Sequence, residues 1–294
     1  MRRLLVTGGT GHLGGELVRR AASLGWDVTA TYLTSQPLRG SAGGVHWARL
    51  DVTDRAAVDD LLDELDPDAV LHTAYRRDGP GAEQVIVGGA AAVAGAAWRV
   101  GARLVHMSTD AVFDGKTAGR YNEDDPPSPV SRYGRAKRDS ERAVRAADRH
   151  ALVVRTSLLY GGEVPGPHEE AALEAAQGER DASFFTDEVR CPTCATDLAD
   201  ALLELAETDL DGVLHVAGED AVSRYEFARL VVASAGLPTD RLRPARSVDS
   251  GLLRPLNCAL DSSRAARLVT APPRGIREVL GERPATRREP APIR

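Results

Sequence analysis

The sequence contains few cysteines and few aromatic residues, and each shortage excludes a class of protein. Only Cys191, Cys194 and Cys258 occur among 294 residues, too few and too clustered for a disulfide framework. Because such frameworks belong to oxidising compartments, we expect a reducing, cytoplasmic location. Aromatic residues make up 4% of the chain although 43% of it is hydrophobic, so the core must be built mainly from aliphatic side chains.

Long apolar runs and an excess of positive charge are also missing. No run approaches the roughly 20 apolar residues that a membrane-spanning helix needs. The formal net charge is −6, which leaves no basic footprint for nucleic acid. We therefore expect neither a membrane nor a nucleic-acid partner.

The pair Cys191-Pro-Thr-Cys194 has the spacing of a redox or metal motif. A redox motif of the thioredoxin type would need a strand before it and a helix opening on its first cysteine. One pair is too few ligands for zinc, and no histidine follows at finger spacing. We expect structural cysteines and no metal site.

The N-terminal stretch carries the most specific pattern in the chain. An apolar run at 4–6 is followed by glycines spaced Gly8-x-x-Gly11-x-x-Gly14 and by an amphipathic helical pattern. Strand, glycine turn and helix together are typical of a dinucleotide-binding site, in which the pyrophosphate lies at the helix N-terminus. We expect the turn to contact a cofactor through Gly8, Thr10, Gly11, His12, Leu13 and Gly14.

Apolar runs alternate with helical patterns through the first half of the chain. Such alternation indicates βαβ units, and thus an α/β fold with a doubly wound, mostly parallel sheet of the Rossmann type. The expected strands are 26–33, 45–50, 69–72, 103–107 and 151–155, and the expected helices are 56–65, 85–100 and 131–147.

The pattern changes after Tyr160, where Gly, Pro, His and Glu crowd together up to about Glu170 and the alternation becomes irregular. Helices at 197–207 and 224–235, with a strand at 212–217 between them, follow this stretch. We expect a Rossmann domain over 1–160 and a smaller substrate-binding region over 161–281 that partly returns to the sheet. The tail 282–294, rich in Pro and Arg, is expected to be disordered.

A second constellation comprises Thr109, directly after the strand at 103–107, and the pair Tyr133 and Lys137. Tyrosine and lysine four residues apart share one face of a helix. An ammonium group there favours the tyrosinate and brings the phenol toward useful acid strength. Thr109 follows its strand at the carboxyl end, where ligands bind in such sheets, and could hydrogen-bond the same carbonyl oxygen.

Together with the glycine turn, these residues resemble the extended short-chain dehydrogenase/reductases, and among them the dTDP-4-dehydrorhamnose reductases. Five further stretches carry the resemblance in the same order: Ser-Thr-Asp-Ala-Val-Phe-Asp-Gly at 108–115, Val-Arg-Thr-Ser-Leu-Leu-Tyr-Gly at 154–161, Pro-Thr at 192–193 leading to Asp-Leu-Ala at 197–199, Ser-Arg-Tyr-Glu-Phe-Ala at 223–228, and Arg-Pro-Leu-Asn-Cys-Ala-Leu-Asp at 254–261.

The resemblance implies hydride transfer from a nicotinamide cofactor to a ketone. Tyr133 would donate the proton, Lys137 would lower its pKa and hold the nicotinamide ribose, and Thr109 would orient the carbonyl. Carried over by position, three other residues would border the cofactor groove: Asp51 and Val52 beside the adenine, and Ala74 in the wall.

Departures from the family pattern leave the substrate open. Related dehydratases have Glu where this chain has Ala111, so dehydration is disfavoured. The reductases usually have Tyr at the position of Ala111 and Trp at that of Leu158, so a stacking surface for a deoxysugar is lost. Ile86 appears at a helix position that is commonly Asn, which leaves the usual water relay without its side chain. We take Asp110, Ala111, Leu158 and His168 as candidate substrate contacts.

The function expected is an NADP-dependent reductase of a ketone on a sugar, a nucleoside or a specialised metabolite. Three alternatives remain open: a dTDP-4-dehydrorhamnose reductase proper, a nucleotide-sugar epimerase, and a non-catalytic subunit such as the regulatory subunit of methionine adenosyltransferase. The expected partner is a small-molecule ketone, and a homodimer is left open.

The choice of cofactor depends on the end of the second strand. An NAD site prefers an acidic residue there, whereas this chain offers hydroxyl groups from Thr31 to Ser35, with Arg39 close behind. These residues suit a 2′-phosphate, so we expect NADP(H), with NAD as the alternative.

Arg76 and Arg77 either meet phosphate or substrate, or lie in a solvated loop. His72 and His106 are expected in the core or the groove.

Overall fold

The computed structural model describes residues 2–35 and 44–281. Arg39 and the tail 282–294, on which two of the sequence-based expectations depend, lie outside the described residues.

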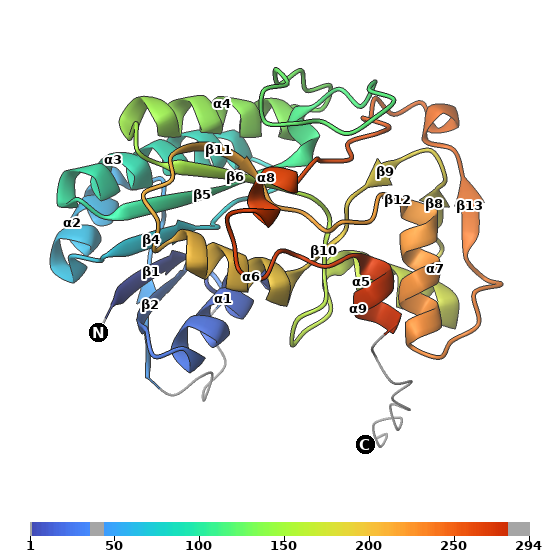
Figure 1. The fold of residues 1–294 in the computed structure, drawn as a ribbon, viewed down its shortest axis with the longest axis horizontal. Coiled ribbons are helices and arrows are strands. Elements are labelled where there is room, and N and C mark those ends of the chain that lie inside the picture. The colour runs from blue at the N-terminus through green and yellow to red at the C-terminus, as the bar shows by residue number, and fades with distance from the viewer. Residues whose placement is uncertain (1, 36–43, 282–294) are drawn as a thin grey trace.

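In the described part of the chain, seven strands form one parallel sheet in the order β11–β6–β5–β4–β1–β2–β3 (Figure 1). This order is that of a doubly wound Rossmann sheet, which confirms the predicted fold class. The strands are β1 (Arg3–Thr7), β2 (Asp27–Tyr32), β3 (Val45–Arg49), β4 (Ala69–His72), β5 (Arg103–Thr109), β6 (Leu152–Thr156) and β11 (Gly212–His215).

Helices cover both faces of the sheet, which explains why its central strands are continuously apolar. Successive side chains of a strand point to opposite faces, so Leu4 and Val6 join one buried cluster whereas Leu5 joins another. One face packs against α1 (His12–Ser23) and α6 (Ala195–Leu205), and the other against α2 (Arg55–Leu65), α3 (Ala90–Val100) and α4 (Arg132–Ala147).

The long helix expected at 85–100 divides into two parts. Its first turn, η1 (Gln84–Gly89), is π-helical, and α3 continues from Ala90. Ile86 is 3% exposed and points into the core. Single π-helical turns occur frequently at functional sites.

The C-terminal part forms a third apolar cluster beside the sheet, built mainly on α5 (Pro167–Gln177), α7 (Arg224–Ser234) and α9 (Ile276–Gly281) (Figure 1). The expectation of irregular chain up to about Glu170 is wrong, because α5 begins at Pro167 with the proline in its first turn. The Glu169 carboxylate accepts hydrogen bonds from the N–H groups of Gly161 (2.7 Å) and Gly166 (2.9 Å). The sequence offered the start signal of a proline at the first helical position.

Short elements complete this part. Three strand pairs lie outside the main sheet: β7 (Leu159–Tyr160) with β10 (Thr193–Cys194), β9 (Val189–Arg190) with β12 (Val222–Ser223), and β8 (Ser183–Phe185) with β13 (Arg243–Ala245). The remaining helical pieces are η2 (Asp110–Val112), η3 (Ser247–Ser250) and α8 (Ser263–Ala266).

All three cysteines are buried and unpaired by disulfides. Within residues 2–35 and 44–281, no cluster of ligating side chains could hold a metal ion. No helix in this same part of the chain is long and apolar enough to cross a bilayer.

Candidate active site

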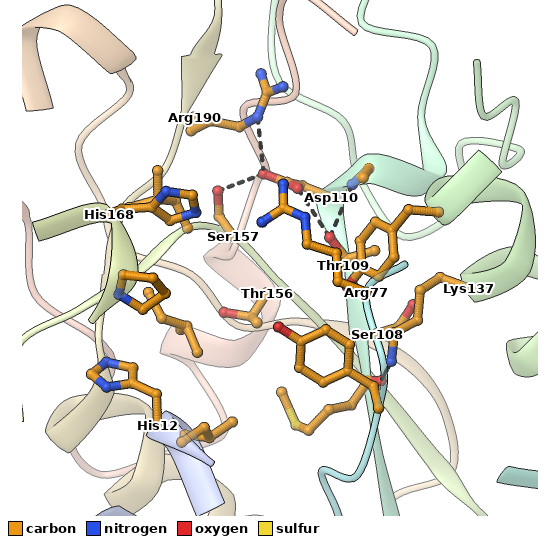
Figure 2. A pocket seen from close by; sticks show the side chains of 18 of the residues that line it. His12, Arg77, Ser108, Thr109, Asp110, Lys137, Thr156, Ser157, His168 and Arg190 are labelled. Atoms are coloured by element: carbon orange, nitrogen blue, oxygen red, sulfur yellow. Dashed lines mark hydrogen bonds and ion pairs between the residues drawn. The ribbon is translucent and has the colours of Figure 1, made fainter. Parts of the chain in front are cut away.

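A pocket of about 350 Å³ opens at the carboxyl ends of β1, β4, β5 and β6 (Figure 2). The strand order reverses between β1 and β4, and ligands of open α/β sheets bind at such a reversal. Of the residues proposed from the sequence, those in its wall are Gly11, His12, Leu13, Gly14, Thr109, Asp110, Ala111, Tyr133, Lys137, Leu158 and His168.

The glycine turn forms one end of the pocket, and its geometry depends on two glycines. Gly8 has φ +73°, and a Cβ there would lie 2.8 Å from the Ala74 Cα. A Cβ on Gly14 would lie 2.1 Å from the Gly8 carbonyl oxygen. Helix α1 begins directly behind Gly11, which supplies no side-chain cap, so the N–H groups of its first turn are available to an anion.

Thr31 forms hydrogen bonds with the backbone of the glycine turn. Its side chain is buried, and its hydroxyl accepts a hydrogen bond from the Gly8 N–H at 3.3 Å while its carbonyl accepts one from the Gly9 N–H at 2.8 Å. Ser35, in contrast, is exposed. Of the hydroxyl groups expected near a 2′-phosphate, Thr31 is therefore engaged with the turn and Ser35 faces solvent.

The other proposed cofactor contacts lie outside the pocket wall. Thr10 is exposed at the turn, and Ala74 packs against Gly8. Asp51 is exposed and accepts hydrogen bonds from the N–H (2.9 Å) and the hydroxyl (2.7 Å) of Thr53, which lower the pKa of its carboxyl. The next residue, Val52, is buried.

Thr109, Tyr133 and Lys137 come together in the pocket. Thr109 is the last residue of β5, and the other two lie in the first two turns of α4, which begins after Ser131. The Ser131 hydroxyl caps this helix by accepting the Gly134 N–H at 3.0 Å. The helix thereby points its N-terminal turns at the end of β5.

Burial sets the ionisation of Lys137. Its Nζ donates to the Met107 carbonyl oxygen at 2.9 Å. Desolvation lowers the pKa of the ammonium to about 8, against the opposing effect of the Glu141 carboxylate. Lys137 therefore titrates near the neutral range.

The Tyr133 phenol shows the opposite shift. Desolvation raises its pKa, and the nearby Tyr75 and Asp110 raise it further, whereas a hydrogen bond with Thr109 lowers it. We expected Lys137 to lower the pKa of Tyr133, but in the structure this pKa is raised. The phenol therefore keeps its proton at neutral pH.

Tyr75 is a pocket residue that the sequence interpretation missed. Its ring centroid lies 6.2 Å from that of Tyr133 and 5.4 Å from the Lys137 ammonium, which faces the Tyr75 ring. Tyr75 follows β4 by three residues, and an aromatic residue beyond a strand end carries no specific signal by itself.

The far end of the pocket is built from arginines, Arg77, Arg190, Arg224 and Arg254, which we call the arginine cluster. Three of them surround the fully buried Glu188 carboxylate. Arg254 forms a two-pronged ion pair with it, and the nearest nitrogens of Arg190 and Arg224 lie 3.7 and 3.8 Å away. A second carboxylate, that of Asp110, lies 3.7 Å from Arg190 Nε. Two carboxylates do not neutralise four guanidinium groups, so the far end carries excess positive charge.

The sequence interpretation did not assign this cluster as a site. Arg224 and Arg254 stand in two of the stretches that carry the family resemblance, but no role was attached to them. Nothing in the sequence around Arg190 indicated a role in a binding site. Arg77, for which two interpretations were open, lines the pocket and is exposed.

His168 lies beside the arginine cluster (Figure 2). It belongs to the first turn of α5, and its Nδ1 lies 3.0 Å from an Arg224 guanidinium nitrogen. Desolvation lowers the pKa of its imidazole to about 3, and Arg224 contributes to this shift. His168 is therefore neutral near pH 7 and accepts the Arg224 hydrogen bond.

His72 and His106 lie in the core beneath Lys137 and outside the pocket wall. Their rings stack with centroids 5.2 Å apart. Burial lowers the pKa of His72 to about 3 and also that of His106. Both are neutral core residues, in agreement with the first of the two locations expected for them.

Fold and pocket together define a Rossmann-type α/β protein with a ligand pocket at the switch point of its sheet. A family model described as the RmlD substrate binding domain matches residues 1–286. The chain belongs to this family.

Individual relatives agree with this assignment. The chain is 37% identical over 257 residues to a dTDP-4-dehydrorhamnose reductase of Mycobacterium tuberculosis, covering 83% of this chain and 79% of that protein. It is 31% identical over 285 residues to the methionine adenosyltransferase 2 subunit beta of Rattus norvegicus, with 91% and 82% covered. A solved dTDP-4-dehydrorhamnose reductase of Bacillus anthracis, in complex with NADP, superimposes with a TM-score of 0.80 at 25% identity, over 96% of this chain and 99% of that one.

Proposed function

We propose that the protein is an NADP-dependent reductase of the short-chain dehydrogenase/reductase type that converts a ketone to an alcohol. The observation that carries the proposal is the convergence of Thr109, Tyr133 and Lys137 in one pocket with the glycine turn. Relatives of the same family include dTDP-4-dehydrorhamnose reductases, one of them solved with NADP.

The turn fits the diphosphate of a dinucleotide. Gly8 and Gly14 let the turn fold tightly, because a Cβ at either position would overlap the backbone of Ala74 or of Gly8. The first turn of α1 behind this turn presents N–H groups to an anion. Thr34 and Ser35 are exposed hydroxyl residues just beyond the end of β2, and we propose that they meet a 2′-phosphate. When bound, the nicotinamide would supply the hydride.

The chain's own residues would handle the proton and the carbonyl. We assign Tyr133 as the donor of the proton to the ketone oxygen, because its raised pKa keeps the phenol protonated until charge develops on that oxygen. Lys137 would hold the ribose and stabilise the phenolate that forms, and Thr109 would orient the carbonyl.

The substrate is proposed to carry a negative charge. Excess positive charge at the arginine cluster lies across the pocket from the glycine turn and favours an anionic group, such as the diphosphate of a nucleotide-linked ketosugar. Ala111 and Leu158 lie between these two ends. They offer no aromatic stacking, so the sugar need not be that of the rhamnose reductases.

The two parts of the chain have different proposed roles. We propose that residues 1–160 hold the cofactor and that 161–281 cover the substrate, because His168, Arg190, Arg224 and Arg254 all come from the second part.

The decisive experiment compares Tyr133→Phe with the wild type in NADPH consumption against a panel of ketones that includes dTDP-4-dehydro sugars. Loss of general acid catalysis is worth about 10²- to 10⁴-fold, and we expect a fall in that range with unchanged NADPH binding. Tyr75→Phe, which removes the neighbouring hydroxyl, serves as the matched control and should retain turnover. Retained activity in Tyr133→Phe would contradict the proposal.

A regulatory subunit is the second candidate, favoured by the 31% identity to the methionine adenosyltransferase 2 subunit beta. A pure binding protein does not require Thr109, Tyr133 and Lys137 together. A stoichiometric protein partner combined with no turnover of any ketone would favour this alternative.

A further inference from the structure

Asp110 lies at the centre of a hydrogen-bonded group in the pocket wall (Figure 2). The residue is 5% exposed, and both carboxyl oxygens are engaged. Oδ1 accepts from the Thr109 hydroxyl at 3.2 Å, and Oδ2 accepts from the Ser157 hydroxyl at 2.5 Å. The Arg190 Nε lies 3.7 Å from Oδ2.

The Thr109 hydroxyl has only one proton to give, and this limits what it can do. Its oxygen already accepts the Ala111 N–H at 3.2 Å. While Asp110 is ionised and the Tyr133 phenol keeps its proton, the Thr109 proton is directed to Asp110 Oδ1, so Thr109 can only accept from other groups, the phenol included. A protonated Asp110 would instead donate to Thr109, whose own proton would then be free to point into the pocket.

We propose that Asp110 is a positioning residue that controls the direction of the Thr109 hydroxyl, so that Thr109 donates toward the ketone oxygen only while Asp110 carries a proton. The inference rests on the proposed ketone reduction and adds to it a proton that neither Tyr133 nor Lys137 holds.

The surroundings of Asp110 act on the pKa of its carboxyl in opposite directions. Burial raises the pKa of its carboxyl, whereas charge from Arg190 and Arg224 and hydrogen bonds from Ser157 and Thr109 lower it, and burial dominates. The Arg190 guanidinium is fixed by the carbonyls of Val189, Pro255 and Leu256, so its charge stays in place. The titratable or charged groups facing Asp110 are Arg190, Arg224, Tyr133, Cys191 and Cys258.

The sign of the pH dependence follows from the geometry. As the pH rises through the titration of Asp110, the fraction with a donating Thr109 falls. We expect kcat/KM for ketone reduction to fall about tenfold per pH unit above that titration.

Asp110→Asn tests this directly, because the amide can donate to Thr109 yet cannot ionise. We call the fall of kcat/KM above the titration of Asp110 the limb of the pH profile. We expect the variant to keep activity at low pH and to lack this limb. Ser157→Ala removes a hydrogen bond that stabilises the ionised carboxylate, so its limb should move to higher pH. In the wild type, the infrared band of the protonated Asp110 carboxyl, absent from Asp110→Asn, should disappear over the same pH range without any turnover.

A limb unchanged in both variants would overturn the inference, as would an infrared band that does not titrate with the limb. If Asp110→Asn fails to fold, the shift in Ser157→Ala and the infrared titration decide. The two proposals fail differently. Activity retained in Tyr133→Phe refutes the reductase mechanism, whereas an inactive Tyr133→Phe with an unchanged limb in Asp110→Asn refutes only the role of Asp110.

Discussion

One end of the pocket is formed by the chain from Gly11 to Gly14, and the other end is formed by guanidinium groups. The first end contains no cluster of like charges that needs a counter-ion, and its shape depends on the close approach of backbone segments in the turn. The second depends on long side chains held by the buried Glu188. The first should therefore be sensitive to a single added methyl group and the second to a change of charge.

The largest effect is expected for Glu188→Gln, which removes the carboxylate shared by three arginines. Breaking a buried ion pair by removing one partner costs about 3–5 kcal/mol, and we expect a loss of that order in the free energy of urea unfolding. Glu226→Gln, at an exposed pair with Arg277, is the control and should cost less than about 1 kcal/mol. Equal effects would mean that Glu188 does not organise the cluster.

Next in size is Gly14→Ala, where the Cβ would meet the Gly8 carbonyl oxygen at 2.1 Å. Overpacking costs about 1–3 kcal/mol, so the NADPH dissociation constant from fluorescence titration should rise about 10- to 100-fold. Gly15→Ala, whose Cβ would lie 3.6 Å from the Gly9 carbonyl oxygen, should bind normally. Unchanged binding in Gly14→Ala would place the dinucleotide elsewhere.

Arg77→Gln tests the charged end at a position that lines the pocket and is exposed. We expect KM for an anionic ketone to rise about fivefold, corresponding to about 1 kcal/mol, with kcat and NADPH binding unchanged. The control is the exposed neighbour Arg76→Gln, whose guanidinium donates to the Pro80 carbonyl at 3.0 Å. A rise in KM for both variants would indicate a general field effect.

The effect that is smallest near pH 7, where His168 is neutral in the folded and the unfolded chain, concerns the pH dependence of stability. His168 has a pKa of about 3 in the folded protein against 6.5 for a free side chain. Between these values the unfolded chain binds the proton and the folded one does not, so stability falls as the pH falls from 6.5 toward 3. His168→Gln should show a shallower loss in urea midpoints over this window. Exposed His46→Gln should not, and identical slopes in all three proteins would exclude His168 as a source.

The seven-stranded sheet and its helices were largely predictable because most of these elements have a local signal. Alternating apolar runs gave the strands, and the spacing of Gly8, Gly11 and Gly14 gave the turn. The start of α5 was missed because its proline at the first helical position lies in a run of glycines and charged residues. The π-helical turn η1 was missed because nothing in the local sequence separates it from an α-helix.

The site was predictable only where its residues follow a motif. Thr109, Tyr133 and Lys137 do, and they lie together as expected. Arg190, Arg224 and Arg254 come from separate segments of the chain, and only folding brings them around Glu188. The burial of Thr31 depends on the neighbouring strands, so its hydroxyl could not be assigned to the glycine turn in advance.

The sequence alone determined the succession of strands and helices along the chain, the glycine turn and the three side chains proposed for the chemistry, because these depend on local conformational preferences and fixed spacings. Only the tertiary structure decided the ionisation of Tyr133 and Lys137, the excess charge at the arginine cluster and the hydrogen bonds of Asp110. These properties depend on desolvation and on contacts between distant segments, which exist only after the chain has packed.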